Sequence, residues 1–341
     1  MHNKEKRKQL FLFIFALIIS ITLAIVLTLV EKQVSVPKMI IFGFSSFLNI
    51  ITICIFTFPY INKIVIEYLK GRKIYYLFLL VVIINPLLNW IFIDSLNGFI
   101  VAFLSYLAWI ALPVIAFMQA YVIDKIKFKS LLLVAGILIL AYGFDSRLMY
   151  SVLSGFDEGK YSFSSLWVSA IILTIYSIQL EKAEIRLRWT LNLKKLILSL
   201  GSLVVLFAVI VPLGLYTEFL VWSPDWPGFA LFILAFIGIW FTIALPEELI
   251  ARSIIQYQLS EKTVPKSSKY YKYHKWIILV VASFIFGLSH HNNTSAEFAW
   301  IYIGFATFAG ILYGICWRYG NLATAMLTHT LVDWIWQLLF R

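Results

Sequence analysis

The sequence predicts an all-α membrane protein, a polytopic transmembrane helical bundle of about 10–11 spans. Hydrophobic residues make up 62% of the 341 residues, whereas Asp, Glu, Lys and Arg make up only 13%, about half their usual share in a soluble domain. The apolar residues form continuous runs of about 20, the length at which a helix crosses a bilayer, and they do not alternate. The basic residues lie in short clusters between those runs. This composition excludes a soluble globular enzyme, a disordered chain and a disulfide-stapled secreted module.

Eleven apolar runs are candidates for transmembrane helices. The fifth and the ninth are short, so the count carries an error of one or two. The first run follows a basic start, but it is longer than the apolar part of a signal peptide and no A-x-A cleavage site follows, which predicts a retained anchor. The runs cover residues 10–30, 39–60, 74–93, 99–123, 130–144, 166–180, 196–216, 229–256, 276–290, 298–317 and 322–340.

The distribution of Lys and Arg predicts that the N-terminus lies in the cytoplasm. With the N-terminus inside, 22 of the 28 basic residues fall in cytoplasmic segments and five fall outside, the excess that multi-pass proteins carry in their cytoplasmic loops. The predicted location is therefore the cell membrane, and rich use of Ile, Lys, Phe and Asn favours the plasma membrane of a low-GC bacterium. The net charge of +11 indicates contact with the anionic lipid of the bilayer, and no nucleic-acid partner is predicted.

Ionisable residues within the predicted spans divide the chain into two regions. Residues 1–195 are predicted to be N-terminal transmembrane helices of unassigned role, because their spans contain almost no such residue. Residues 196–341 are predicted to be a catalytic helical core. A charge at membrane depth is costly, so each one marks a candidate functional site. The core carries six of them, namely Glu247, Glu248, Arg252, His290, His329 and Asp333.

The spacing within this cluster places side chains on shared helix faces. Glu248 and Arg252 are four residues apart, so they can form an ion pair. Glu247 is turned by about 100° from Glu248 and can point into a different space. His329 and Asp333 are also four residues apart, in position for a hydrogen bond.

Glu247, His290 and His329 are predicted to lie at comparable depths, roughly 18, 21 and 11 Å from the cytoplasmic ends of their helices. A carboxylate with two imidazoles in a dehydrated pocket favours activation of water, with the carboxylate as general base. A second His with a hydrogen-bonding side chain can stabilise the oxyanion of a tetrahedral intermediate. The same three residues are also a catalytic zinc set, so zinc stays open as a cofactor. Their spacing does not match the HExxH helix of metalloproteases.

Three motifs of this region resemble those of a known family. In chain order they are Glu247-Glu248-x-x-x-Arg252, Phe286-x-x-x-His290 and His329-x-x-x-Asp333. The set resembles the CAAX protease and bacteriocin-processing (CPBP, or Abi) intramembrane proteases, a group that includes the eukaryotic CAAX-prenyl endopeptidase. The resemblance covers roughly residues 196–341.

The resemblance implies a role for each motif residue. Glu247 would be the catalytic carboxylate that activates water together with His290. His329 and Asp333 would form the oxyanion-stabilising pair, and the Glu248–Arg252 pair would support the site. Asn is the more familiar residue where this chain has Asp333. An ionised Asp would oppose the oxyanion, so Asp333 is expected to be protonated or turned to hold His329.

The implied function is an intramembrane endopeptidase that cleaves a peptide precursor or a membrane-protein tail near the cytoplasmic face. The family includes proteins named as metalloproteases, and a metal-free glutamate mechanism is also argued for it. The alternative is a non-catalytic CPBP-type membrane scaffold, or a bacteriocin self-immunity or regulatory protein. A proton-coupled transporter is a third interpretation, but two similar halves with Gly/Pro-broken helices are missing. Taken singly, each charged pair is also explained as an ion pair or hydrogen bond that only stabilises the helices. The sequence does not indicate the oligomeric state.

Overall fold

A computed structural model describes residues 190–262, 264–291 and 293–340, together with isolated positions within 11–21, 44–52, 97–115 and 131–139, all of them helical. The contacts of the chain form two units, residues 1–124 with 135–184 and residues 125–134 with 185–341. The helices described below belong to the second unit. The first six predicted spans lie largely outside the described residues. The predicted boundary at residue 195 and the role of residues 1–195 remain predictions.

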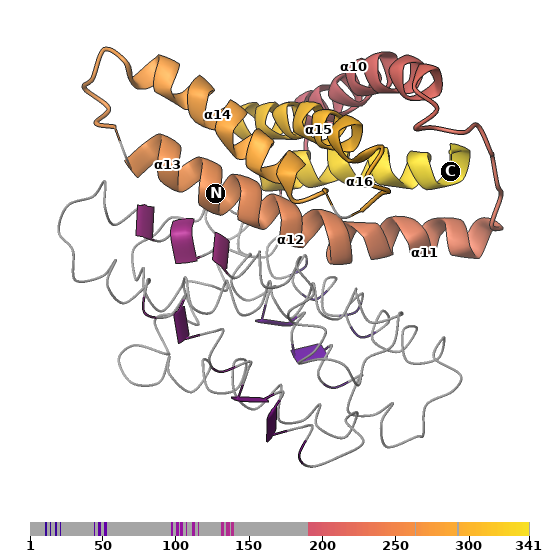
Figure 1. Cartoon of the computed structure of the whole chain (residues 1–341), viewed down its shortest axis with the longest axis horizontal. Helices are drawn as coiled ribbons and strands as arrows, with labels where there is room; N and C mark the ends of the chain where they lie inside the picture. Colours follow the sequence, from indigo (N-terminus) through magenta and orange to yellow (C-terminus); the bar gives the residue numbers. More distant parts are fainter. Residues whose placement is uncertain are drawn as a thin grey trace. The chain divides into compact units, whose positions relative to one another are not determined.

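Every regular element described between residues 190 and 340 is a helix, which confirms the helical class for this region (Figure 1). Two of these helices, α10 and α15, are long and apolar enough to cross a membrane, whereas the full bundle of about 10–11 spans remains a prediction. The elements are α10 (Leu193–Tyr216), α11 (Phe229–Ile239), η5 (Trp240–Ala244), α12 (Leu245–Glu248), η6 (Leu249–Gln256), α13 (Tyr257–Lys262), α14 (Tyr271–Leu288), α15 (Ala299–Tyr319) and α16 (Leu322–Leu339).

The elements from α11 to α13 follow one another without a break and form one long helix (Figure 1). Two stretches of it, η5 and η6, have the wider π-helical turn. Pro246 lies at the start of α12 between them, and its missing N–H and its ring disturb an ordinary α-helical ladder. Wide turns of this kind are frequent at functional sites, because the extra residue changes where the following side chains point. Glu247 and Glu248 occupy the short α-helical segment between the two π-helical stretches.

Small residues let α14 and α15 pack closely. Gly310 and Gly314 form a GxxxG pattern on α15, an arrangement that allows two helix backbones to approach in a membrane. A Cβ atom at Gly310 would lie 3.1 Å from Cβ of Ser283 on α14. A Cβ atom at Gly314 would lie 3.0 Å from Oε1 of Gln256. This close approach brings α15 within hydrogen-bonding reach of η6.

A tight turn at Gly320 and Asn321 joins α15 to α16. The side chain of Asn321 accepts a hydrogen bond from the backbone N–H of Thr324 at 3.0 Å and so caps the N-terminus of α16. The N-terminal half of α16 is buried against its neighbours, and the helix packs against α10, α15 and η5. His329 therefore enters the interior of the unit from α16, opposite the glutamates of α12.

Candidate active site

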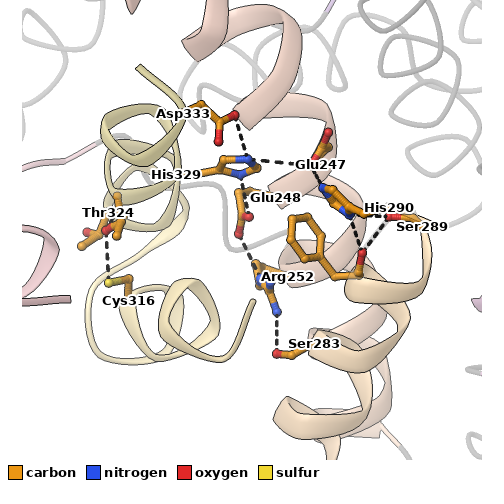
Figure 2. A network of polar contacts seen from close by, with 12 residues as sticks. Glu247, Glu248, Arg252, Ser283, Ser289, His290, Cys316, Thr324, His329 and Asp333 are labelled. Carbon is orange, nitrogen blue, oxygen red and sulfur yellow. Dashed lines mark hydrogen bonds and ion pairs between the residues drawn. The ribbon is translucent and has the colours of Figure 1, made fainter. Parts of the chain in front are cut away.

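The structure brings all six predicted site residues together from three parts of the chain (Figure 2). The long helix supplies Glu247, Glu248 and Arg252, the turn after α14 supplies His290, and α16 supplies His329 and Asp333. In Figure 2 the imidazole of His329 lies between the carboxylates of Asp333 and Glu248, while Glu247 and His290 lie to one side.

Glu248 is fully buried and bonded through both carboxylate oxygens. Oε2 accepts a hydrogen bond from Nε of Arg252 at 2.9 Å, which confirms the ion pair that their spacing predicts. Oε1 lies 3.0 Å from Nδ1 of His329, 81 residues further along the chain. A carboxylate paired with a guanidinium accepts hydrogen bonds, so Nδ1 of His329 is the donor. Glu248 thus fixes the orientation of the His329 ring, so that Nε2 points away from Glu248.

Arg252 is itself held by residues of the long helix and of α14. Nη1 donates to Oε1 of Gln256 at 3.4 Å and to Oγ of Ser283 on α14 at 3.3 Å. Gln256 in turn donates from Nε2 to the carbonyl of Gly314 on α15 at 3.5 Å. The guanidinium also lies over the ring of Phe286, 5.4 Å from its centroid, an arrangement that attracts a cation. These contacts connect α14 and α15 to Glu248 through one buried side chain.

Aromatic rings fix the plane of the His329 imidazole. The ring of Tyr313 stacks on it, with centroids 4.6 Å apart and an angle of 15° between the planes. The ring of Phe286 meets it edge-on at 5.8 Å. His329 is buried, with only 3% of its surface exposed.

His290 lies just beyond the end of α14, which stops at Leu288 rather than continuing to residue 290 as the sequence predicts. Its Nδ1 lies 2.8 Å from the carbonyl oxygen of Phe286, one of the carbonyls that a helix end leaves without a partner. A carbonyl can only accept, so Nδ1 carries the proton and donates it. Ser289 donates to the same carbonyl at 2.8 Å. His290 therefore presents Nε2, without a proton in the neutral ring, to the site.

Glu247 faces both of these Nε2 atoms. Its Oε2 lies 3.9 Å from Nε2 of His290 and 3.8 Å from Nε2 of His329. Both separations exceed a direct hydrogen bond, and contacts of this length in a polar site are commonly bridged by water. The side chain of Glu247 is 26% exposed, whereas that of Glu248 is 0% exposed. The two neighbouring glutamates thus point into different spaces, as the 100° turn between them predicts.

Asp333 lies one helical turn after His329, with Oδ2 3.4 Å from Nε2 of that residue. Of the two alternatives that the sequence leaves for Asp333, this geometry matches a carboxylate turned to hold His329. His329 is consequently surrounded by three carboxylates, those of Glu247, Glu248 and Asp333.

The zinc set that the sequence leaves open does not have the geometry of a metal site. Among the described residues no three His, Cys, Asp or Glu side chains are arranged so that they could hold a metal ion. Oε2 of Glu247 stands nearly 4 Å from each imidazole nitrogen, whereas atoms that share a tetrahedral zinc at about 2.0–2.1 Å lie closer together.

Sequence reasoning missed several residues that shape this site. Ser283 lies 31 residues from Arg252, and Tyr313 stacks on His329 from another helix, so no spacing rule selects them. Gln256 lies four residues after Arg252, a spacing that could have indicated their contact. The GxxxG pattern at Gly310 and Gly314 is a signal that could have indicated the close contact between α14 and α15.

A comparison with protein families adds an independent observation. Residues 229–335 match the family described as "Rce1-like: Type II CAAX prenyl endopeptidase Rce1-like", a part of the CPBP family. Residues 229–335 are thus similar to an Rce1-like domain. The match begins at the first residue of α11 and ends within α16, so it contains every residue of the site described above. Searches of curated proteins and of solved structures found no match. The family described in this way is a membrane-associated protease family, and the match covers about a third of this chain.

Proposed function

We propose that the Rce1-like domain is an intramembrane endopeptidase in which Glu247 and His290 activate a water molecule for attack on a peptide bond. The observation that carries the proposal is the position of the Glu247 carboxylate, partly exposed and less than 4 Å from the Nε2 atoms of His290 and His329. A water that bridges these groups can give its proton to Glu247. His290 accepts a hydrogen bond from the same water through Nε2 and so positions it. The water oxygen then forms the new bond to the carbonyl carbon, and the peptide C–N bond breaks as Glu247 passes the proton to the leaving amine.

His329 has the complementary role in this proposal. Its Nδ1 is committed to Glu248, so only Nε2 can reach a substrate. In the proposal the ring carries protons on both nitrogens, a state that three surrounding carboxylates favour. Nε2 can then donate to the oxyanion that forms as water adds to the carbonyl. Asp333, at 3.4 Å, keeps that N–H directed into the site until the substrate arrives.

The substrate class follows from the family and from the apolar surroundings. We propose a peptide precursor or a membrane-protein tail, cleaved near the cytoplasmic face of the membrane. The matched family is described as a CAAX prenyl endopeptidase, so tails with and without a prenyl group both belong in a substrate panel. No step of the mechanism requires zinc.

The test is cleavage of such a panel by the full chain reconstituted in liposomes, read as the mass of the products. Glu247→Ala, His290→Ala and His329→Ala are each expected to abolish cleavage while the protein still melts cooperatively. Equal processing by the parent and all three variants would contradict the proposal.

The alternative, a non-catalytic scaffold or immunity protein, gives the opposite pattern in cells. There the three alanine variants would complement a deletion of the gene fully, whereas changes within residues 1–195 would not. A protease instead requires all three side chains for complementation.

A further inference from the structure

The first turns of α14 and the linker before it carry an unbalanced positive charge. Residues 262–275 contain five Lys and no Asp or Glu. Lys269 and Lys272 are exposed, and Lys275 of α14 and Arg318 of α15 lie half-buried. We call Lys269, Lys272, Lys275 and Arg318 the basic collar.

Aromatic side chains hold three members of the collar in place. Nζ of Lys269 lies 4.9 Å from the ring centroid of Tyr270, and Nζ of Lys275 lies 4.4 Å from that of Tyr271. The guanidinium of Arg318 lies 4.4 Å from the ring centroid of Trp276. Its Nη1 is buried and has no hydrogen-bond partner in the described part of the chain. Basic groups beside Tyr and Trp are the side chains found at the headgroup level of a membrane.

An apolar stripe begins directly after the collar and runs along the outer face of α14. It consists of Ile277, Val280, Val281, Phe284 and Leu288, which are between 38% and 60% exposed. Their spacing is that of one helix face. The opposite face, with Leu279, Ala282 and Ser283, is fully buried. From Ile277 to Leu288 the stripe is about 17 Å long, close to the hydrocarbon depth of one leaflet, about 15 Å.

We propose that the basic collar binds the headgroups of anionic phospholipids while the apolar stripe contacts their acyl chains. The charge of the exposed Lys269 and Lys272 is complementary to an anionic headgroup. The occupant of this face is therefore lipid of the surrounding bilayer. The inference is independent of the proposed protease activity.

This arrangement fixes the depth of the candidate active site. With the collar at the headgroups of one leaflet, Leu288 lies one leaflet deep, and His290 follows it in the next turn. The lipid contact would thus tie the depth of His290 and of the Glu247 carboxylate to the headgroups on the cytoplasmic side.

The test is native mass spectrometry of the full chain in detergent, titrated with phosphatidylglycerol and phosphatidylcholine of the same chain length. The parent is expected to retain phosphatidylglycerol preferentially. Lys272→Gln should weaken phosphatidylglycerol binding about fivefold. In a triple variant the binding should weaken about fivefold for each charge removed by Lys269→Gln, Lys272→Gln and Lys275→Gln. The same three positions changed to Arg should keep the preference.

Lys194→Gln is the matched control, because Lys194 is an exposed lysine on the first turn of α10, outside the collar. It should leave the affinity for phosphatidylglycerol unchanged. Equal retention of the two lipids by the parent would overturn the proposal, and so would an equal loss of affinity in Lys194→Gln and Lys272→Gln. The first result is expected if another part of the chain covers α14, and the second if only net charge matters.

Discussion

The two halves of the site differ in how tightly their groups are held. On the Glu248 side, the carboxylate, the guanidinium of Arg252 and the imidazole of His329 meet at 2.9 and 3.0 Å and are buried. On the Glu247 side, the carboxylate is partly exposed, and its separations from two imidazole nitrogens are 3.8 and 3.9 Å. The sequence neighbours Glu247 and Glu248 thus have opposite environments.

The difference indicates a division of labour. Short, buried contacts hold a side chain in one geometry, which is what a group that positions others must do. Longer separations with some exposure leave room for water and substrate, which is what a reacting group needs. In this account the Glu248 side positions His329, and the Glu247 side carries out the chemistry. Changes on the two sides should therefore have separable effects.

The largest effect is expected from Glu247→Gln. The amide keeps the shape of the side chain but cannot accept the proton of water, so cleavage should fall by about 10²–10⁴-fold. The melting temperature should stay near that of the parent, because the amide has the shape of the carboxylate and the side chain is partly exposed. Rates from product masses and melting in detergent are the two measurements. Glu297→Gln, at an exposed glutamate in the loop between α14 and α15, is the matched control and should cleave at the parental rate.

Arg252→Met should act on stability first. It leaves the carboxylate of Glu248 buried without its cation, a loss of about 3–5 kcal/mol in the free energy of unfolding. Chemical denaturation in detergent measures it. Glu248→Gln combined with Arg252→Met removes the uncompensated charge as well and should recover part of the loss. If Arg252→Met alone were as stable as the parent, the buried ion pair would not be what holds the Glu248 side together.

Gly314→Ala should disturb the Glu248 side from a distance. The new Cβ would lie 3.0 Å from Oε1 of Gln256 and 3.3 Å from Nη1 of Arg252, so those side chains must shift. Overpacking of this kind costs about 1–3 kcal/mol, and cleavage should fall with it as His329 loses its support. Gly304→Ala on the same helix has no atom within 4 Å of the new Cβ and serves as the control. Equal behaviour of the two variants would contradict the role given to the α14–α15 contact.

The smallest effect is expected from Ser283→Ala, which removes the hydrogen bond that Ser283 accepts from Arg252 and the one it donates to the carbonyl of Leu279. The expected loss is about 1 kcal/mol in the free energy of unfolding. Ser253→Ala is a matched control, because Ser253 is also fully buried and its hydroxyl has no hydrogen-bond partner among the described residues. That variant should be neutral or slightly stabilising. A larger loss of stability in Ser253→Ala than in Ser283→Ala would show that Ser283 does not support Arg252.

Sequence alone predicted the parts of the site that depend on local spacing. The Glu248–Arg252 ion pair and the shared face of His329 and Asp333 follow from a separation of four residues, and both are confirmed. The hydrogen bond between Glu248 and His329 could not be predicted, because it joins residues 81 positions apart and depends on how α16 packs against the long helix.

The helices were predicted well as apolar segments and less well at their ends. The predicted span 229–256 corresponds to a helix that continues to Lys262 and contains two π-helical stretches. Hydropathy carries no information about turn width, so these stretches were not foreseen. His290 was predicted within a helix, whereas it lies in the turn that follows. There the Nδ1 of His290 donates a hydrogen bond to the carbonyl oxygen of Phe286. That bond leaves Nε2 as the nitrogen that faces Glu247.

The central claim, that Glu247 acts with the imidazole of His290, is tested most directly by comparing two neighbouring histidines. His290 and His291 each have Nδ1 within 3.1 Å of a backbone carbonyl, but only His290 is paired with Glu247. Cleavage of one substrate in liposomes by His290→Ala and by His291→Ala is the measurement. The account predicts that His290→Ala abolishes cleavage and that His291→Ala cleaves at the parental rate. Parental rates in both variants would contradict it.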